Sequence, residues 1–232
     1  MLFRQLFEPQ SSAFSYLIAD AVGGKAMLID PVLDKMELYQ QLLDELQLQL
    51  MYAIDTHVHA DHITALAALR QRYGCETVHG EHSKAQGISR RVADGEWLML
   101  DRLKLKALYT PGHTDDSYSF LLNATPADLL FSGDTLLIRS TGRTDFQHGD
   151  ASAQYHSLFN KLLRLDDETR LLPGHDYQGM TSSTIGEEKR HNPRLQVNSE
   201  QQYLDLMATV RLDPPRQIDV AVPANLNGGR LS

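Results

Sequence analysis

Short apolar runs separated by polar turns are the main pattern of the chain, and they predict a mixed α/β fold. Runs of apolar and β-branched residues bounded by turn residues indicate strands, and apolar residues at helical spacing indicate amphipathic helices. The predicted strands are 14–19, 26–30, 50–54, 76–79, 97–100, 103–109, 118–122, 128–132 and 171–172. The predicted helices are 34–49, 63–73, 152–165 and 200–207.

The order of these elements predicts two sheet-forming halves with helices outside them. Gly23 and Gly24 predict a hairpin turn between the first two strands. A last apolar run covers 218–222, and 223–229 is predicted to form a closing turn. The chain contains no Pro/Gly/Ser linker and no repeat of solenoid period. We therefore expect residues 1–232 to form one layered α/β domain.

Polar clusters follow five of the predicted strands, where each strand ends. They are Asp30, the motif 57–62, His113, Asp134 and His175. The motif, Thr56-His57-Val58-His59-Ala60-Asp61-His62, places three imidazoles and a carboxylate within six residues. These groups are good ligands for zinc, iron and manganese, and burying them together without a cation costs free energy. The sequence therefore predicts a metalloenzyme with its site along one edge of the sheets.

Composition narrows the partners of such an enzyme. The formal charge of −8 argues against a nucleic-acid surface, which needs a basic stripe. The single cysteine, Cys75, excludes an intrachain disulfide and is expected to be packed as a small apolar residue. The first seven residues carry one positive charge and no apolar stretch of signal length, and no later run approaches a membrane span. We expect a cytoplasmic protein without a membrane partner.

The motifs together resemble the metallo-β-lactamase superfamily. The resemblance rests on His57-x-His59-x-Asp61-His62, Pro111-Gly112-His113-Thr114, Gly133-Asp134 and Pro173-Gly174-His175. It implies an αββα sandwich. The general ligand scheme of the superfamily assigns one metal site to His57, His59 and His113 and a second to Asp61, His62 and His175, with Asp134 able to bridge them.

Further segments resemble the persulfide dioxygenases of the ethylmalonic-encephalopathy-protein type. They are 3–7, 136–147, 174–177, 192–194 and 218–225. This resemblance implies an enzyme that uses one Fe(II) per chain and O2 to convert glutathione persulfide to sulfite and glutathione. It implies that His57, His113 and Asp134 are the iron ligands, a two-histidine, one-carboxylate set that leaves three coordination positions open. His59, Asp61, His62 and His175 would then surround a single iron.

A glutathione substrate carries two carboxylates, so the site is expected to supply cations and donors. Arg139 is the candidate for a carboxylate contact, with an ordinary surface salt bridge as the equally weighted alternative. The Tyr177 hydroxyl is a second candidate donor. Arg143 and Asp145 are expected to form an ion pair that holds their loop.

Two other polar residues lie near the predicted site. Asp30 is expected to serve a helix N-terminus or a turn at Pro31 rather than a metal. Asn225 either touches glutathione or adopts a turn conformation.

Other functions remain open at this point. The first alternative is a thioester hydrolase of the glyoxalase II type, in which two metals activate a hydroxide. The short segment after His175 and the loop 142–146 argue against it, and the acidic charge argues against a nuclease. A non-catalytic sulfur-binding protein is a third alternative, although no ligand is missing. The family resemblance and the amphipathic helices also make a homodimer an expectation.

Overall fold

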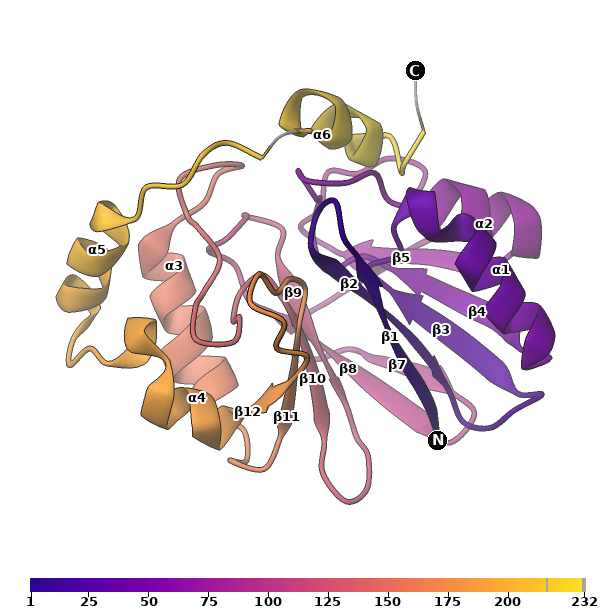
Figure 1. Ribbon diagram of the computed structural model, residues 1–232, viewed down its shortest axis with the longest axis horizontal. Coiled ribbons are helices and arrows are strands. Elements are labelled where there is room, and N and C mark those ends of the chain that lie inside the picture. The colour runs from indigo at the N-terminus through magenta and orange to yellow at the C-terminus, as the bar shows by residue number, and fades with distance from the viewer. Residues whose placement is uncertain (216, 231–232) are drawn as a thin grey trace.

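Two six-stranded sheets pack face to face, with helices on both outer faces (Figure 1). The computed structural model describes residues 1–215 and 217–230. The strands are β1 (Leu2–Glu8), β2 (Ala13–Ala19), β3 (Lys25–Ile29), β4 (Gln49–Ile54), β5 (Glu76–Gly80), β6 (Arg90–Val92), β7 (Trp97–Leu100), β8 (Leu103–Tyr109), β9 (Tyr118–Leu122), β10 (Leu129–Gly133), β11 (Arg170–Pro173) and β12 (Ser183–Thr184). The α-helices are α1 (Met36–Glu45), α2 (Leu66–Tyr73), α3 (Ala151–His156), α4 (Ile185–His191), α5 (Glu200–Thr209) and α6 (Ile218–Leu226).

Both sheets are mixed. The first has the order β1-β2-β3-β4-β5-β6, antiparallel from β1 to β3 and parallel from β3 to β6. The second has the order β12-β11-β10-β9-β8-β7 and is antiparallel except for the parallel pair of β10 and β11. Helices α1 and α2 cover the first sheet, whereas α3, α4 and α5 lie on the second (Figure 1). This is the expected αββα sandwich.

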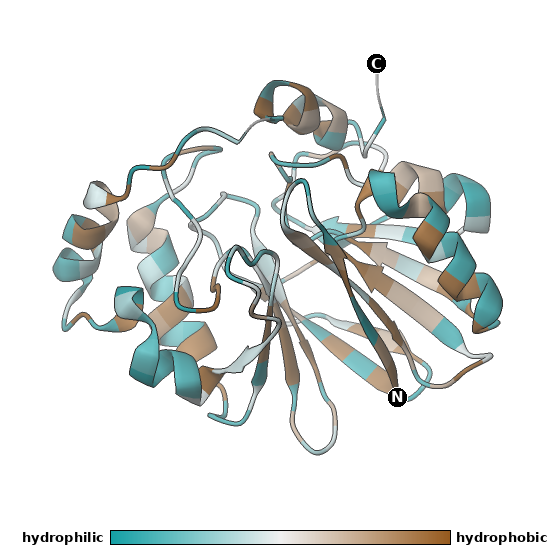
Figure 2. Cartoon of the chain, in the orientation of Figure 1, coloured by the Kyte–Doolittle hydropathy of each residue, from teal (hydrophilic) through white to brown (hydrophobic). Residues whose placement is uncertain are grey.

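Strand β2 shows why the sheets are buried on both faces. Tyr16 and Ile18 point into the core between the sheets, and Leu17 and Ala19 point toward the core under α1 and α2. Every residue of β2 is buried. Because neighbouring side chains of a strand point to opposite faces, a continuous apolar run of this kind is typical of a strand covered on both sides. Figure 2 shows apolar residues gathered on the strands and polar ones on the outer helices.

Most predicted elements lie where the pattern placed them, and the hairpin between β2 and β3 is confirmed. The predicted helix 152–165 is helical up to Arg164 but changes type, because α3 passes into a π-helical stretch, Ser157–Lys161, and a 3₁₀ turn, Leu162–Arg164. Two further 3₁₀ turns cover Leu33–Lys35 and Pro193–Leu195. No helix of the described residues is long and apolar enough to cross a membrane.

The prediction of a closing turn over 223–229 was wrong in its extent. Helix α6 continues through Pro223 to Leu226, and the turn begins only at Asn227. Proline usually ends a helix because it lacks an N–H. Here tertiary bonds hold the end of α6, since Gln86 donates its backbone N–H to the Leu226 carbonyl and Ala67 donates to the Gly228 carbonyl.

Helix α4 and strands β1, β6 and β12 were not predicted. The start of α4 does carry a sequence signal, because the Thr184 side chain accepts a hydrogen bond from the Glu187 N–H at 3.1 Å, and Thr-x-x-Glu is a capping sequence. Helix α4 matters for the site because its glutamates hold the loop after β10.

Candidate metal centre

Strand ends gather the predicted metal ligands at one edge of the sandwich. The histidine motif follows β4, His113 follows β8, Asp134 directly follows β10, and His175 lies two residues past β11. One donor atom each from His57, His113 and Asp134 lies within 4.8 Å of the others. The structure therefore brings together the three residues that were predicted to hold iron.

Each of the two histidines of this triad is held by a hydrogen bond at its Nδ1 atom. The His113 Nδ1–H donates to the Arg143 carbonyl at 2.8 Å, which leaves the Nε2 lone pair for a metal. Thr56 Oγ1 and His57 Nδ1 share a hydrogen bond of 2.9 Å. The rings stand at 87° with their centroids 5.0 Å apart, and His113 Nε2 lies 3.6 Å from the Asp134 carboxylate. The donor atoms thus converge on one point, as a metal site requires.

Two glycines permit this close approach. A Cβ on Gly142 would lie 2.8 Å from His113 Nδ1, and a Cβ on Gly174 would lie 2.7 Å from Asp134 Oδ1. Carbon atoms do not approach that closely without displacing a neighbour. Glycine at these positions of the Thr141-Gly142-Arg143 and Pro173-Gly174-His175 segments is therefore a steric requirement of the ligand positions.

Asp61, His62 and His175 form a hydrogen-bonded chain beside the triad. His175 Nδ1 lies 2.7 Å from Asp134 Oδ1, and His175 Nε2 lies 2.9 Å from Asp61 Oδ2. His62 Nδ1 lies 2.7 Å from the same Asp61 oxygen. Asp61 Oδ2 thus bonds to both His62 and His175, although the other ring nitrogen of His62 has no such bond among the described residues.

Charge in the centre follows from burial and from these contacts. Burial and the neighbouring His59 and His113 lower the pKa of His57 to about 3, so its ring is a neutral ligand at neutral pH. Burial alone would lower the pKa of His175, but the Asp134 and Asp61 carboxylates outweigh it and raise that pKa well above its usual value. Burial and His62 lower the pKa of His59 to about 3.

His59 does not join the triad. Its donor atoms group with Asp61 and His62 on one side and with Asp30 and Asp55 on the other. His59 Nε2 lies 3.2 Å from the Asp30 carboxylate. Within the described residues, His59 Nδ1 and His62 Nε2 are buried without a hydrogen-bond partner. Buried nitrogens of this kind need a ligand, and a metal, a water or a substrate atom can satisfy them.

Asp30 bonds to the histidine loop and not, as expected, to a helix N-terminus or turn at Pro31. Its carboxylate accepts from the Thr56 N–H at 2.7 Å and from the Thr56 hydroxyl at 3.0 Å, and it is buried. It therefore fixes the start of the histidine loop.

Arg143 and Asp145 form the expected ion pair, at 2.6 Å and 2.8 Å. Arg143 also donates to the carbonyls of Leu212 and Asp213, so it links its loop to the segment before α6. No local pattern predicted that the Arg143 carbonyl would accept a hydrogen bond from His113.

The Arg139 side chain forms two salt bridges in the structure. Its guanidinium pairs with Glu187 and Glu188 of α4, and Glu188 is fully buried. This is the salt-bridge alternative, although one partner is in the core rather than on the surface. A substrate carboxylate would have to compete with both glutamates, so a substrate contact of Arg139 stays a prediction.

Tyr177 is 72% exposed and its ring lies parallel to the His175 ring, at 5° and 6.0 Å between centroids. Its hydroxyl is therefore accessible beside the centre.

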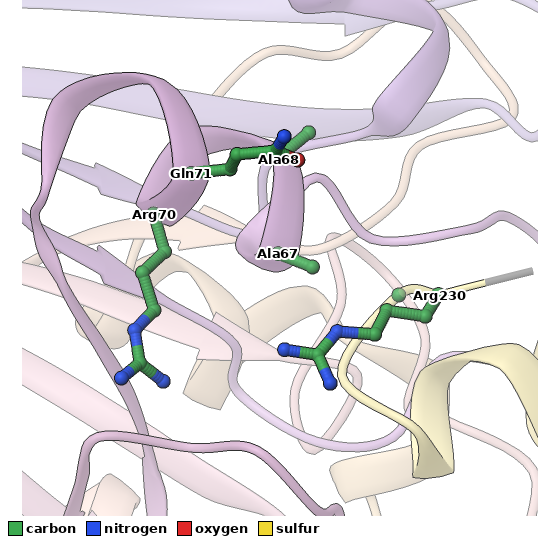
Figure 3. A pocket seen from close by; sticks show the side chains of 6 residues that line it. Ala67, Ala68, Arg70, Gln71 and Arg230 are labelled. Carbon is green, nitrogen blue, oxygen red and sulfur yellow. The ribbon is translucent and has the colours of Figure 1, made fainter.

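Two hollows open on the surface, one away from the candidate metal ligands and one beside the histidine loop. A cavity of about 650 Å³ is bounded by the first turns of α2 and by Gly229 and Arg230, and the guanidinium groups of Arg70 and Arg230 point into it (Figure 3). It contains none of the metal ligands. A smaller hollow of about 180 Å³ lies against Val58 of the histidine loop, with Gln147 and Val222 among its walls.

Comparison with known proteins shows the class to which this site belongs. The family model described as the metallo-beta-lactamase superfamily matches residues 9–175, so the chain belongs to that superfamily. Within it, the chain groups with ETHE1 proteins. It is 44% identical to the human protein named persulfide dioxygenase ETHE1, mitochondrial, over 99% of this chain and 89% of that one. It is 47% identical to ETHE1 from Myxococcus xanthus, whose crystal structure covers 99% of this chain and 100% of its own at a TM-score of 0.94.

A more distant structure bears on metal number. A protein solved in a di-iron-bound form is 27% identical, with a TM-score of 0.64 over 83% of this chain and 99% of its own. In that protein, therefore, a similar fold binds two iron atoms.

Proposed function

We propose that this chain is an iron-dependent persulfide dioxygenase that oxidises glutathione persulfide with O2 to sulfite and glutathione. The observation that carries the proposal is the triad of His57, His113 and Asp134, whose donor atoms lie within 4.8 Å of one another and which shares no residue with the neighbouring group of His59, Asp61 and His62. The ETHE1 relatives, one named a persulfide dioxygenase, support the reaction and the substrate class.

The triad fits one iron. Two neutral imidazoles and a carboxylate are the ligand set of mononuclear non-haem iron oxygenases, whereas a structural zinc site uses four ligands. Ferrous iron held in this way would supply the open coordination positions that O2 chemistry requires, and the four electrons that reduce O2 come from the outer sulfur of the persulfide as it becomes sulfite. We propose one Fe(II) per chain, held by His57, His113 and Asp134.

The other side chains have roles of orientation and binding in this proposal. His175, between Asp134 and Asp61, fixes the direction of the Asp134 carboxylate, as hydrogen-bonded neighbours of metal ligands commonly do. The accessible Tyr177 hydroxyl would donate to a glutathione carboxylate. Sulfite has three oxygen atoms and O2 supplies two, so water supplies the third and glutathione leaves as the thiol.

The alternative is a dinuclear thioester hydrolase of the glyoxalase II type. A second group of possible metal ligands, His59, Asp61 and His62, and the di-iron-bound relative favour it. The hydrogen bond between Asp61 and His175 counts against it, because a second metal held by these two atoms would have to displace that bond.

One assay pair separates the two functions. Protein loaded anaerobically with Fe(II) is given glutathione persulfide while O2 uptake and sulfite are recorded, and the same protein is given an acylglutathione thioester. We expect one O2 consumed per sulfite formed, with slow thioester cleavage. Rapid thioester cleavage without O2 uptake would replace this proposal with the hydrolase.

Two properties of the whole protein belong to the proposal as well. The human relative is named mitochondrial, so a cytoplasmic location of this chain is a separate expectation that cell fractionation tests. A homodimer is expected from the family resemblance and is tested by sedimentation at several protein concentrations.

A further inference from the structure

We propose that Asn225 is a positioning residue of the metal centre, because its side-chain amide fixes the backbone of the histidine loop. The inference rests on the proposed function, since it assumes that this loop holds iron. Asn225 lies in α6 and is 161 to 166 residues away in sequence from the loop residues that it contacts. Its side chain is 1% exposed.

Three hydrogen bonds join the amide to the loop. Asn225 Nδ2 donates to the His59 carbonyl at 2.9 Å and to the His62 carbonyl at 2.8 Å. Asn225 Oδ1 accepts from the Thr64 N–H at 2.9 Å. The opposite orientation of the amide would place its oxygen against two carbonyls and its NH2 against an N–H, so these partners determine the orientation.

This bonding leaves no donor for a substrate. A side-chain amide has two N–H donors, and His59 and His62 take both. A glutathione carboxylate needs a donor, so it would gain nothing from Asn225 without breaking a bond to the loop. The geometry therefore favours a role through the loop over direct contact with glutathione.

The loop depends on such side chains because little of it is in regular structure. Its start is held where Thr56 donates to Asp30, and its middle is held where Val58 donates to Asp116 and accepts from Gln147. Asn225 holds the end. His57 lies two residues before His59 and five before His62, so a shift of those two residues can reach this proposed iron ligand along a short stretch of backbone.

The end of α6 is itself fixed, which makes Asn225 a rigid support. The Leu226 and Gly228 carbonyls accept backbone hydrogen bonds from Gln86 and Ala67. Without the amide, the buried His59 and His62 carbonyls would lose their partner, and buried carbonyls are rarely left without one. The loop would then rearrange or admit water.

The test compares Asn225→Ala and Asn225→Asp with the control Asn227→Asp. Asn225→Asp keeps the shape but removes both donors, and Asn227 is an exposed residue just past α6. Fe(II) affinity is measured by competition with a chromophoric chelator, and hydrogen exchange is measured on peptides covering 56–66 of the metal-free protein. We expect both Asn225 variants to bind Fe(II) roughly 10- to 100-fold more weakly, as for other groups that orient metal ligands. Their loop should exchange faster, and the control should match wild type.

Kinetics of the iron-loaded variants provide the discriminating readout. A positioning role lowers kcat and leaves KM for glutathione persulfide nearly unchanged, whereas a lost substrate contact raises KM. A raised KM with wild-type iron affinity would overturn the inference. If wild-type protein binds no iron, the proposed function fails; if wild type and Asn225→Ala bind it equally, this inference alone fails. If both variants fail to fold, the test is hydrogen exchange of the Thr64 backbone N–H in the wild-type protein. Rapid exchange there would contradict the hydrogen bond from Thr64 to Asn225.

Discussion

The ring nitrogens that His57 and His113 turn away from the centre are both hydrogen bonded, to Thr56 and to the Arg143 carbonyl. At the scale of the residue, the site is therefore defined by fixed lone pairs rather than by the number of histidines. Residue identity and spacing in the motif predicted a metal, but only the fold shows which nitrogens converge, because ring orientation depends on partners that are distant in sequence.

Removing a triad ligand should abolish iron retention. In His113→Ala or Asp134→Ala, two ligands remain, and we expect less than about a tenth of wild-type iron after gel filtration, since metal affinity depends on ligand number. The control is His148→Ala, which removes an exposed histidine outside the cluster. Wild-type iron content in Asp134→Ala, measured by elemental analysis, would remove Asp134 from the ligand set.

Arg139→Ala should act mainly on stability. The substitution leaves Glu188 buried without its cation, and breaking a buried ion pair of this kind costs about 2–3 kcal/mol of unfolding free energy. Urea unfolding measures this, and Arg102→Ala, which removes an ion pair to Asp20 from an arginine whose side chain is 83% exposed, serves as the control with an unchanged midpoint. A raised KM for persulfide at unchanged stability would instead assign Arg139 to the substrate.

Cys75 gives a prediction for pH. Burial raises the pKa of its thiol from 9.0 to about 11, so the folded state prefers the neutral thiol. The contribution of this group to stability is complete below pH 9 and is lost between pH 9 and pH 11, because the unfolded thiol ionises first. Iodoacetamide at pH 8 should label Cys75 only after unfolding. Rapid labelling of the folded protein would show that the thiol is accessible, and Cys75→Ala should lack the alkaline loss of stability.

At the scale of the element, loops after strands carry the candidate metal ligands, and other elements hold those loops. The strands were predicted close to where they lie, because alternating and continuous apolar runs reflect the burial of each face, and the candidate residues therefore follow strand ends as expected. The supports were not predictable in the same way. Glu188 reaches Arg139 from α4, and Asn225 reaches the histidine loop from α6. Such contacts depend on how distant elements pack, and no local pattern encodes them.

Arg143 tests this dependence on a supporting element. Arg143→Ala loses the pair with Asp145 and the bonds to the Leu212 and Asp213 carbonyls, and we expect a loss of about 2 kcal/mol of unfolding free energy together with weaker iron retention. Asp145→Asn keeps the carbonyl bonds and should have the smaller effect on both quantities. Equal iron affinity in wild type and Arg143→Ala, measured with a competing chelator, would show that iron binding does not depend on the bonds that the Arg143 side chain makes.

At the scale of the whole molecule, one core joins the two sheets. Ile18 and Met27 of the first sheet pack in the same cluster as Phe120 and Phe131 of the second. We therefore propose that the chain is one cooperative domain. Calorimetry of the metal-free protein should give a single transition with equal calorimetric and van't Hoff enthalpies. Two resolved transitions would divide the chain into separate units.

The number of irons in the working enzyme tests the central claim most directly. Metal-free protein is titrated anaerobically with Fe(II), and at each step the initial rate of O2 uptake with glutathione persulfide is measured. The triad of His57, His113 and Asp134 predicts a rate that rises linearly and stops at one iron per chain. A rate that continues to rise until two irons are bound would contradict the mononuclear site, and iron binding without any O2 uptake would contradict the dioxygenase.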